Sequence, residues 1–580
     1  MGNDTERLIR AVAEAVVGDD LAITTPFGVR RLVYADYTAS GRGLSFVEDF
    51  IREQVLPWYA NTHTEASATG LVTSRLREQA RAAVRQAAGA GDDTAVIFAG
   101  SGCTAAIDKL VGILQLRIPA DLDRRYGLSE RIPAAQRPVV LVGPYEHHSN
   151  ELAWRETIAD VVEVPASADG RIDLVALESA LVRHADRPLR IGSFSAASNV
   201  TGVLTDTDAV ARVLHRHGAL AFFDFAAAAP YVDIAMDGVP GEPETAKDAV
   251  FLSPHKFVGG PGTPGVLLLR RSLARNSVPV VPGGGTVSFV TAHEHAYLDD
   301  VEHREEGGTP AIVESVRAGL VMRLKQAVGV EAIQRREHEL LQRALTRWRA
   351  NPGIDILGDT GADRLAIVSF TVRSPVGRLL HHNYLVALLN DLLGVQARGG
   401  CSCAGPYGHR LLGIDDSRSA RFTHAVGAGC GGLKPGWVRV NLNYFVPDEV
   451  VDYLVEAVDL VATHGWRLLG AYRFDPATGL WHHRKQVVVA GPDLGDLRFG
   501  GGVPHLPERS GRLGLEALPR QLDEARRILA AAVPPTLARS VGGPGDPGGL
   551  GDVCPAGEAE GLTWFETGFE TAAATGALLP

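Results

Sequence analysis

The chain carries a lysine between a short apolar run and a glycine-rich turn. The apolar run Ala249–Leu252 predicts a buried strand, and Ser253-Pro254-His255-Lys256 follows it directly. Four of the seven residues from 259 to 265 are glycine, which lets the backbone approach a ligand closely and adopt positive φ. Burial at the end of a core strand disfavours the charged form of a lysine and leaves a nucleophilic amine. Lys256 is therefore a candidate for forming a Schiff base with a carbonyl compound.

A second turn of small residues follows the apolar run Val96–Ala99. It contains Gly102-Cys103-Thr104, and the residues after it have the apolar spacing of a helix. The N–H groups and the positive dipole end of a helix N-terminus bind anions. We therefore expect Gly102, Cys103 and Thr104 to bind a phosphate group, although a plain strand–turn–helix connection has the same pattern.

Three further apolar runs end on side chains that titrate or form hydrogen bonds. A carboxylate at the end of a buried strand needs a partner, and an imidazole changes its charge near neutral pH. Open α/β sheets bind their ligands beyond the carboxyl ends of their strands, so these side chains are expected at one sheet edge. The runs and the side chains that follow them are Pro138–Val142 with His147, Leu189–Phe194 with Asn199, and Ala219–Phe223 with Asp224.

Taken in chain order, these segments resemble the class V family of pyridoxal-phosphate enzymes, which contains aminotransferases and cysteine desulfurases. A single motif could arise by chance, whereas matches in the family's order over roughly residues 30–465 favour the family. The motifs that carry the resemblance are Tyr34-Ala35-Asp36, Tyr59-Ala60-Asn61-Thr62-His63, Glu146-His147-His148-Ser149-Asn150, Ser198-Asn199-Val200-Thr201-Gly202, Asp224-Phe225-Ala226-Ala227, Ser253-Pro254-His255-Lys256 and Glu306-Gly307-Gly308-Thr309-Pro310.

The resemblance implies a fold-type I pyridoxal-phosphate-dependent transferase of the α/β class, with a large mixed-sheet α/β domain and a smaller α/β domain. We expect residues 1–50 to pack with the small domain and residues 51–305 to form the large cofactor-binding domain. Residues 306–465 would form the small domain. Residues 466–580 are rich in glycine and proline, which predicts a partly disordered extension with one docking helix near 513–532.

The cofactor that the resemblance implies is pyridoxal 5'-phosphate, bound through Lys256. By the same resemblance, His147 stacks on the pyridine ring and moves protons, and Asp224 keeps the ring nitrogen protonated so that the ring withdraws electrons. A threonine at the position of Thr309 reaches, in relatives, a phosphate bound mainly by the other subunit, which implies a homodimer. The residues assigned to the cofactor in this way are Gly102, Cys103, Thr104, His147, Asn199, Asp224, Ser253, His255, Lys256 and Thr309.

The resemblance to cysteine desulfurases rests on a cysteine in the expected small domain. Arg398 precedes Cys403 by five positions, and Ala404-Gly405-Pro406 follows it, as in that group of enzymes. The implied reaction converts cysteine to alanine and leaves a persulfide on Cys403, with Lys256 and His147 as the other catalytic residues. A protein that accepts the sulfur is a further partner that this chemistry allows.

The implied substrate-binding residues are an arginine at the end of the family region and three others. Arg439 would hold the substrate α-carboxylate, because a planar guanidinium binds a carboxylate with two hydrogen bonds. Arg398, Asn61 and His63 are the remaining candidates.

Several alternatives remain open at this point. Ala105 and Ala227 depart from the family's motifs, so the chain could be a pyridoxal-phosphate-binding scaffold without turnover. An aminotransferase, an epimerase or a C–S lyase of the same family would use the same cofactor site. Cys401 lies close enough to Cys403 to carry the sulfur itself. A structural zinc site could use the cysteines at 401, 403 and 430 with His409 or His424, although Cys-x-Cys spacing is tighter than usual, and the prediction is that no metal is bound.

The composition excludes several other classes of protein. Of the 580 residues, 45% are hydrophobic and 22% charged, which is typical of a soluble globular protein, and the net charge of −11 argues against nucleic-acid binding. No apolar run approaches the roughly 18–20 residues that cross a bilayer, and the first residues lack the apolar core of a signal peptide. Five cysteines in so long a chain do not make a disulfide framework. We therefore expect a cytoplasmic protein with no nucleic-acid or membrane partner.

Overall fold

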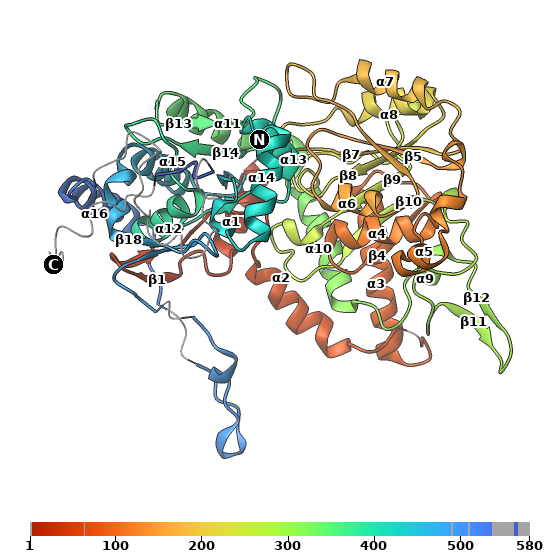
Figure 1. Cartoon of the computed structure of the whole chain (residues 1–580). Coiled ribbons are helices and arrows are strands. Elements are labelled where there is room, and N and C mark those ends of the chain that lie inside the picture. Colours follow the sequence, from red (N-terminus) through yellow and green to blue (C-terminus); the bar gives the residue numbers. More distant parts are fainter. Residues whose placement is uncertain (1–2, 63, 489–490, 508–510, 536–561, 567–580) are drawn as a thin grey trace. The chain divides into compact units, whose positions relative to one another are not determined.

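The computed structural model of the chain describes residues 3–62, 64–488, 491–507, 511–535 and 562–566. These residues fold into two compact units, each of which is built from more than one segment of the chain (Figure 1). The large unit comprises Met1–Val17, Tyr37–His338 and Gly358–Leu365. The small unit comprises Gly18–Asp36, Glu339–Leu357 and Ala366–Pro580.

The large unit is built on a seven-stranded sheet in the order β4-β10-β9-β8-β7-β5-β6. Strand β10 runs antiparallel to both of its neighbours, and the strands from β9 to β6 run parallel to one another, so the sheet is mixed. The strands are β4 (Thr94–Ala99), β5 (Val139–Val142), β6 (Asp160–Glu163), β7 (Arg190–Ser195), β8 (Leu220–Asp224), β9 (Ala249–Leu252) and β10 (Gly265–Arg270).

Helices cover both faces of this sheet, because its central strands are apolar on both sides (Figure 1). Along β7, Ile191 belongs to the core cluster that includes helix α4 (Gly102–Ile113). The next residue, Gly192, faces the other way, where a Cβ would stand 2.6 Å from Leu214 of helix α8 (Thr207–Arg216). The alternation of successive side chains therefore separates the two helical layers.

The direction of the strands determines where the candidate site lies. Strand β4 is antiparallel to β10, and β10 is antiparallel to β9, so β4 points the same way as β5, β7, β8 and β9. The carboxyl ends of these five strands consequently meet at one edge of the sheet. The residues that follow them at this edge are Gly102–Thr104, His147, Asn199, Asp224 and Ser253–Lys256.

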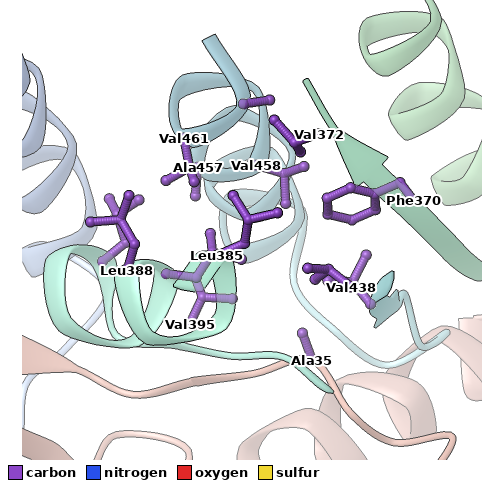
Figure 2. Close-up of a cluster of buried hydrophobic side chains, with 14 of the residues drawn as sticks. Ala35, Phe370, Val372, Leu385, Leu388, Val395, Val438, Ala457, Val458 and Val461 are labelled. Atoms are coloured by element: carbon purple, nitrogen blue, oxygen red, sulfur yellow. The ribbon is translucent and has the colours of Figure 1, made fainter. Parts of the chain in front are cut away.

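The small unit contains a four-stranded antiparallel sheet in the order β13-β14-β17-β16. Helices α12 (His382–Leu393) and α15 (Asp448–His464) contribute to its core, where Leu385 and Val458 lie close to Phe370 and Val438 of the sheet (Figure 2). The strands are β13 (Ile354–Ile356), β14 (Ile367–Val372), β16 (Arg398–Gly400) and β17 (Trp437–Asn441). Because side chains alternate along a strand, Arg439 lies on the face of β17 opposite to Val438.

The extension after residue 465 is part of the small unit where it is described. The predicted docking helix near 513–532 is present as α16 (Ala517–Ala531). Its Gln521 donates through Nε2 to the Tyr453 hydroxyl at 3.0 Å and accepts the N–H of Arg31 at 2.6 Å. A hairpin of β18 (Tyr472–Phe474) and β19 (Trp481–His483) was not predicted. The remaining expectation for 466–580 stays a prediction, and residues 489–490, 508–510, 536–561 and 567–580 of that range lie outside the described residues.

The remaining helices and strands complete both units. No helix among the described residues is long and apolar enough to cross a membrane. In the large unit they are α1 (Asn3–Ala15), α2 (Ser45–Phe50), α3 (Ala68–Ala87), α5 (Ala120–Tyr126), α6 (Ser149–Arg155), α7 (Leu174–Arg183), β11 (Val287–Val290), β12 (His295–Tyr297), α9 (Val301–Arg304) and α10 (Ile312–Val328). In the small unit they are β1 (Ala22–Thr25), β2 (Gly28–Arg31), β3 (Val33–Tyr34), β15 (Val395–Gln396), α13 (Gly405–Leu411) and α14 (Asp416–Gly427). Helix α11 (Val330–Arg349) has residues in both units.

Candidate functional site

Lys256 lies in a tight turn that begins directly after β9. Its backbone N–H donates to a carbonyl oxygen three residues earlier at 3.0 Å. A Cβ on Gly260 would stand 2.1 Å from the carbonyl oxygen of Pro254, so the turn has room only for glycine at that position. The Ser40 hydroxyl donates to the His255 carbonyl oxygen at 3.2 Å and ties the segment before α2 to this turn. The sequence argument placed the lysine in the interior, and the structure leaves its side chain half-buried at the sheet edge.

The start of α4 lies against the same turn. Gly102 has a φ of 58°, and a Cβ there would stand 2.9 Å from the Ser253 hydroxyl oxygen. That oxygen accepts the backbone N–H of Cys103 at 2.9 Å. Thr104 is exposed, and its hydroxyl forms a 2.6 Å hydrogen bond with the hydroxyl of Ser149. Of the predicted phosphate-binding residues, Cys103 uses its N–H in a bond to Ser253, whereas Thr104 is an exposed residue whose hydroxyl is hydrogen-bonded to Ser149.

Asp224 is buried at the end of β8, with 4% of its surface exposed. Burial raises the pKa of its carboxyl, and the N–H of Ala226 at 2.8 Å and the charge of Lys256 act in the opposite direction. Burial and the neighbouring Asp224 raise the pKa of the Cys103 thiol well above its ordinary value. Burial and the charge of Lys256 lower the pKa of His255 to about 4, so this imidazole is neutral at pH 7. Because burial disfavours the charged form of Asp224, a cationic ligand group beside it would stabilise the carboxylate.

His147 follows a buried carboxylate, Glu146, to which the sequence analysis assigned no role. Glu146 accepts hydrogen bonds from the N–H of Gly143 at 3.1 Å, the amide of Asn150 at 2.6 Å, and both the N–H and the hydroxyl of Ser195 at 2.9 and 2.6 Å. Burial raises the pKa of Glu146 to about 7 in spite of these donors. The network joins the end of β5 to the end of β7 and fixes the turn that carries His147.

Asn199 lies in a closed turn after β7. The Ser198 hydroxyl oxygen accepts the N–H groups of Val200 and Thr201 at 3.2 and 3.1 Å, which is the local hydrogen bonding that serine favours in turns. Asn199 itself is buried, with 8% of its surface exposed. The turn places this side chain at the sheet edge next to the end of β8, because the N–H of residue 196 donates to the Asp224 carbonyl oxygen at 2.8 Å.

Two residues predicted for different roles meet on the large unit. The amide of Asn61 donates to the Thr309 hydroxyl oxygen at 3.2 Å, and both side chains are exposed. His63, the other substrate candidate in this segment, lies outside the described residues. The structure therefore joins a predicted substrate residue to a predicted phosphate residue, a pairing that the sequence did not indicate.

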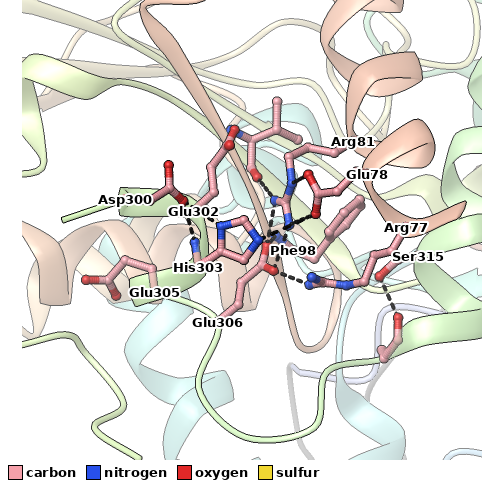
Figure 3. Close-up of polar contacts among 12 residues, drawn as sticks. Arg77, Glu78, Arg81, Phe98, Asp300, Glu302, His303, Glu305, Glu306 and Ser315 are labelled. Atoms are coloured by element: carbon pink, nitrogen blue, oxygen red, sulfur yellow. Dashed lines mark hydrogen bonds and ion pairs between the residues drawn. The ribbon is translucent and has the colours of Figure 1, made fainter. Parts of the chain in front are cut away.

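A buried ion cluster underlies the segment that leads to Thr309 (Figure 3). Both Arg77 and Arg81 of α3 pair with Glu306, and the three side chains are 5%, 1% and 3% exposed. Glu306 also accepts the N–H of Phe98 from β4 at 2.6 Å. Burial favours the neutral acid, but the two arginines outweigh it and lower the pKa of Glu306. Sequence analysis missed this cluster because its arginines lie on a helix face that an apolar pattern cannot reveal.

The small unit places the two predicted substrate arginines on one carboxylate. Asp36 accepts Nη2 of Arg439 at 2.8 Å through Oδ1 and Nε of Arg398 at 2.9 Å through Oδ2. The two arginines are also directly opposite each other on β17 and β16. Burial lowers the pKa of Arg439, although the charge of Asp36 acts in the opposite direction. The side chain of Arg398, by contrast, is 44% exposed. Two cations on one anion leave a net positive charge, which suits a carboxylate ligand.

The loop cysteines lie in a tight turn between β16 and α13. The N–H of Ala404 donates to the Cys401 carbonyl oxygen at 3.1 Å, and the two residues between them, Ser402 and Cys403, have φ values of 51° and 55°. Positive φ at both central residues is typical of a type I′ turn, and for residues other than glycine it costs about 1–3 kcal/mol each. Cys403 is exposed at this turn and Cys401 is half-buried.

The structure gives no support to the zinc alternative. Within the described ranges, no group of three or more histidine, cysteine, aspartate or glutamate side chains is placed to hold a metal ion. Cys430, which that alternative requires beside Cys401 and Cys403, lies in the hydrophobic core of the small unit. The structure therefore favours Cys401 and Cys403 as free thiols over Cys401 and Cys403 as metal ligands.

Comparisons with known proteins agree with this arrangement. The family model described as Aminotransferase class-V matches residues 33–454. A probable cysteine desulfurase of Halalkalibacterium halodurans is 27% identical over 67% of this chain and 87% of its own length. Another, from Halobacterium salinarum, is 28% identical over 68% of this chain and 88% of its own length.

Solved structures show the same fold. The cysteine desulfurase of Thermococcus onnurineus has a TM-score of 0.59 and 21% identity, and the likeness covers 74% of this chain and 94% of that one. The cysteine desulfurase CsdA of Escherichia coli has a TM-score of 0.57 and 22% identity, with the same coverage. The predicted α/β fold of type I, with a large mixed sheet, is thereby confirmed.

Proposed function

This chain belongs to the class V aminotransferase family, and on that premise we propose that it is a pyridoxal-phosphate-dependent enzyme that removes sulfur from cysteine. The likeness to cysteine desulfurases and the exposed thiol of Cys403 support the reaction. The observation that carries the proposal is the accessible Cys403 on a strained turn of the small unit. The large unit, described by itself, has a lysine and a buried aspartate at its sheet edge.

The residues at the sheet edge of the large unit fit pyridoxal phosphate. Burial disfavours the charged form of Asp224, and a protonated pyridine nitrogen beside it would stabilise the carboxylate. The first turn of α4 has backbone N–H groups without intrahelical acceptors, and the adjacent Thr104 hydroxyl is exposed, which suits a phosphate. Lys256 would hold the carbonyl carbon covalently, and His147 would lie beside the ring. When bound, the cofactor supplies the electron-withdrawing ring that labilises the bonds of the substrate α-carbon.

The thiol supplies the step that distinguishes a desulfurase from an aminotransferase. The thiolate of Cys403 forms an S–S bond with the sulfur of the substrate while the Cβ–S bond of the substrate breaks. The electron pair of that bond remains on carbon, and a proton delivered there completes alanine. Cys403 retains the sulfur as a persulfide, which a thiol reductant or an acceptor protein then removes.

The arginine pair of the small unit binds the carboxylate of the substrate in this proposal. Arg439 donates through Nη2 to Asp36, and its planar guanidinium is suited to binding a carboxylate with two hydrogen bonds. Losing a charge-assisted pair costs on the order of 2–4 kcal/mol, so Arg439→Lys should raise KM for cysteine roughly 30- to 700-fold. Arg398→Lys is the matched control, because the half-exposed Arg398 is expected to change KM only a few-fold.

The deciding experiment follows alanine and sulfide from L-cysteine, with purified full-length protein, pyridoxal phosphate and a thiol reductant. Lys256→Ala should lose turnover. Cys403→Ser should lose alanine and persulfide formation, whereas Cys401→Ser, the matched control two residues away, should retain most of the rate.

Two outcomes contradict the desulfurase assignment. One is Cys403→Ser producing alanine from cysteine as fast as the unaltered protein. The other is a protein that makes no alanine from cysteine but turns over another amino acid. The second result would assign the chain to an aminotransferase, epimerase or lyase reaction on the same cofactor.

A further inference from the structure

Ser149, the first residue of α6, connects two groups of the proposed cofactor site. Its hydroxyl oxygen lies 2.6 Å from the Thr104 hydroxyl oxygen and 3.0 Å from Nδ1 of His147. Its backbone N–H donates to the same Nδ1 at 3.2 Å. A continuous chain of hydrogen bonds therefore runs from the start of α4 to the imidazole.

The backbone donor determines how the imidazole is protonated. An N–H group can only donate, so Nδ1 of His147 must act as an acceptor, and the proton of the neutral ring is on Nε2. The Ser149 hydroxyl, by contrast, has one proton and two neighbours that can accept it. It donates either to Nδ1 of His147 or to the Thr104 oxygen, and not to both.

We propose that Ser149 is a positioning residue that fixes the tautomer of His147 and couples it to occupancy of the Thr104 hydroxyl by the cofactor phosphate. Without an anion, Thr104 donates to Ser149, and Ser149 donates to Nδ1. With a phosphate, Thr104 donates to the anion, so Ser149 rotates its proton toward the Thr104 oxygen. Nδ1 then loses the hydroxyl donor of Ser149 and keeps its backbone donor. No covalent bond forms or breaks in this change, because the hydroxyl groups of Thr104 and Ser149 only rotate.

The coupling alters the imidazole at its other nitrogen. A donor at one ring nitrogen draws electron density from the ring and makes the N–H at the other nitrogen more acidic. Removing the Ser149 donor reverses this effect, so His147 holds its Nε2 proton more tightly once the phosphate is bound. In this way, binding of the cofactor phosphate changes how tightly His147, the predicted proton-transfer residue, holds its Nε2 proton.

The inference rests on the proposed function, because it requires a phosphate at Thr104, and its test does not depend on turnover. The full chain is labelled with ¹⁵N-histidine, the His147 signals are assigned with His147→Gln, and inorganic phosphate and then pyridoxal phosphate are added. The Nδ1 signal should move downfield on addition of each anion, and Nε2 should remain protonated throughout.

Three variants test whether the Ser149 hydroxyl causes the shift of the Nδ1 signal. In Ser149→Ala the Nδ1 signal should start downfield and fail to respond, whereas Ser149→Thr, which keeps a hydroxyl, should restore the response. Thr104→Val should also remove the response. If pyridoxal phosphate binds, as its absorption band reports, but Nδ1 does not move or moves equally in Ser149→Ala, the inference is wrong and the proposed function stands. If pyridoxal phosphate does not bind, both are wrong.

Discussion

Two buried glutamates of the large unit hold loops that carry predicted site residues, and they do so by opposite electrostatic means. Glu306 lies three residues before Thr309 and is paired with Arg77 and Arg81. Glu146 lies directly before His147 and accepts hydrogen bonds from neutral groups alone. Each side chain is nine-tenths or more buried.

The difference in partners reverses the effect of burial on the two carboxyls. Charged partners lower the pKa of Glu306 below its ordinary value, so the carboxylate form is the stable one at neutral pH. Neutral donors do not offset burial at Glu146, whose pKa rises to about 7 with a further contribution from the charge of Asp224. Burial alone therefore does not determine the charge of a carboxyl group, because the charge of its partners decides it.

The largest predicted effect concerns the ion cluster. Glu306→Gln removes the carboxylate that Arg77 and Arg81 share and leaves Arg81 with its partly exposed partner Glu78. Breaking a buried pair in this way costs about 3–5 kcal/mol. We expect a loss of that size in the free energy of unfolding, measured by urea denaturation at pH 7. Glu78→Gln is the matched control, because Glu78 also pairs with Arg81 but is 47% exposed, and exposed pairs contribute about 0–1 kcal/mol. Equal losses in the two variants would show that the cluster is not a structural anchor.

The second prediction uses the pH dependence of Glu146. Its native pKa of about 7 lies above the ordinary 4.5, so the native state binds the proton more tightly than the unfolded state does. Its stabilising contribution is present in full below pH 4.5 and is lost as the pH rises through 7. The difference corresponds to roughly 3 kcal/mol at most.

The measurement is the free energy of unfolding between pH 4.5 and 8 for the unaltered chain and for Glu146→Gln, which carries no titrating group. The unaltered chain should lose stability relative to the variant as the pH rises. Glu306 should cause no such loss in this range, because its lowered pKa adds stability above pH 4.5 that disappears only on acidification below that value. Parallel pH profiles of the unaltered chain and Glu146→Gln would contradict the raised pKa.

The sequence predicted the framework of the large unit better than its buried polar groups. The turn after β9 and the start of α4 were found where the apolar runs end, because a run of apolar residues before glycines identifies a strand end without tertiary information. The sequence analysis assigned no role to Arg77 and Arg81, which lie on α3. The structure buries the arginines beside Ala80 and Val84, and no periodicity of apolar residues reports that a charge has a buried partner.

In the small unit, too, apolar patterns in the sequence did not predict some of the loop structure or the ion pairs. The sequence analysis predicted no helix between Cys403 and Arg439, but the structure has helices α13 and α14 there. Helix α14 buries only Phe422 and Ala425, so its apolar pattern is too sparse to be recognised. Asp36 was quoted as part of a motif, yet its bonds to both substrate candidates join segments about four hundred positions apart in the chain. Such a pairing requires the fold.

The smallest predicted effect concerns the Ser195 hydroxyl, one of the neutral donors that distinguish Glu146 from Glu306. Ser195→Ala removes one of the donors to Glu146 but leaves the backbone N–H of the same residue in place. A hydrogen bond to a neutral group contributes about 1 kcal/mol and one to a charged group about 1.5–3 kcal/mol. Because Glu146 loses its proton as the pH rises through 7, the variant should lose about 1 kcal/mol at pH 5 and about twice as much at pH 8. Urea denaturation at the two pH values measures both losses. Thr157→Ala is the control, because the Thr157 hydroxyl donates to a backbone carbonyl oxygen, that of Trp154. A loss for Ser195→Ala that is the same at pH 5 and pH 8 would mean that Glu146 does not change its charge in this range.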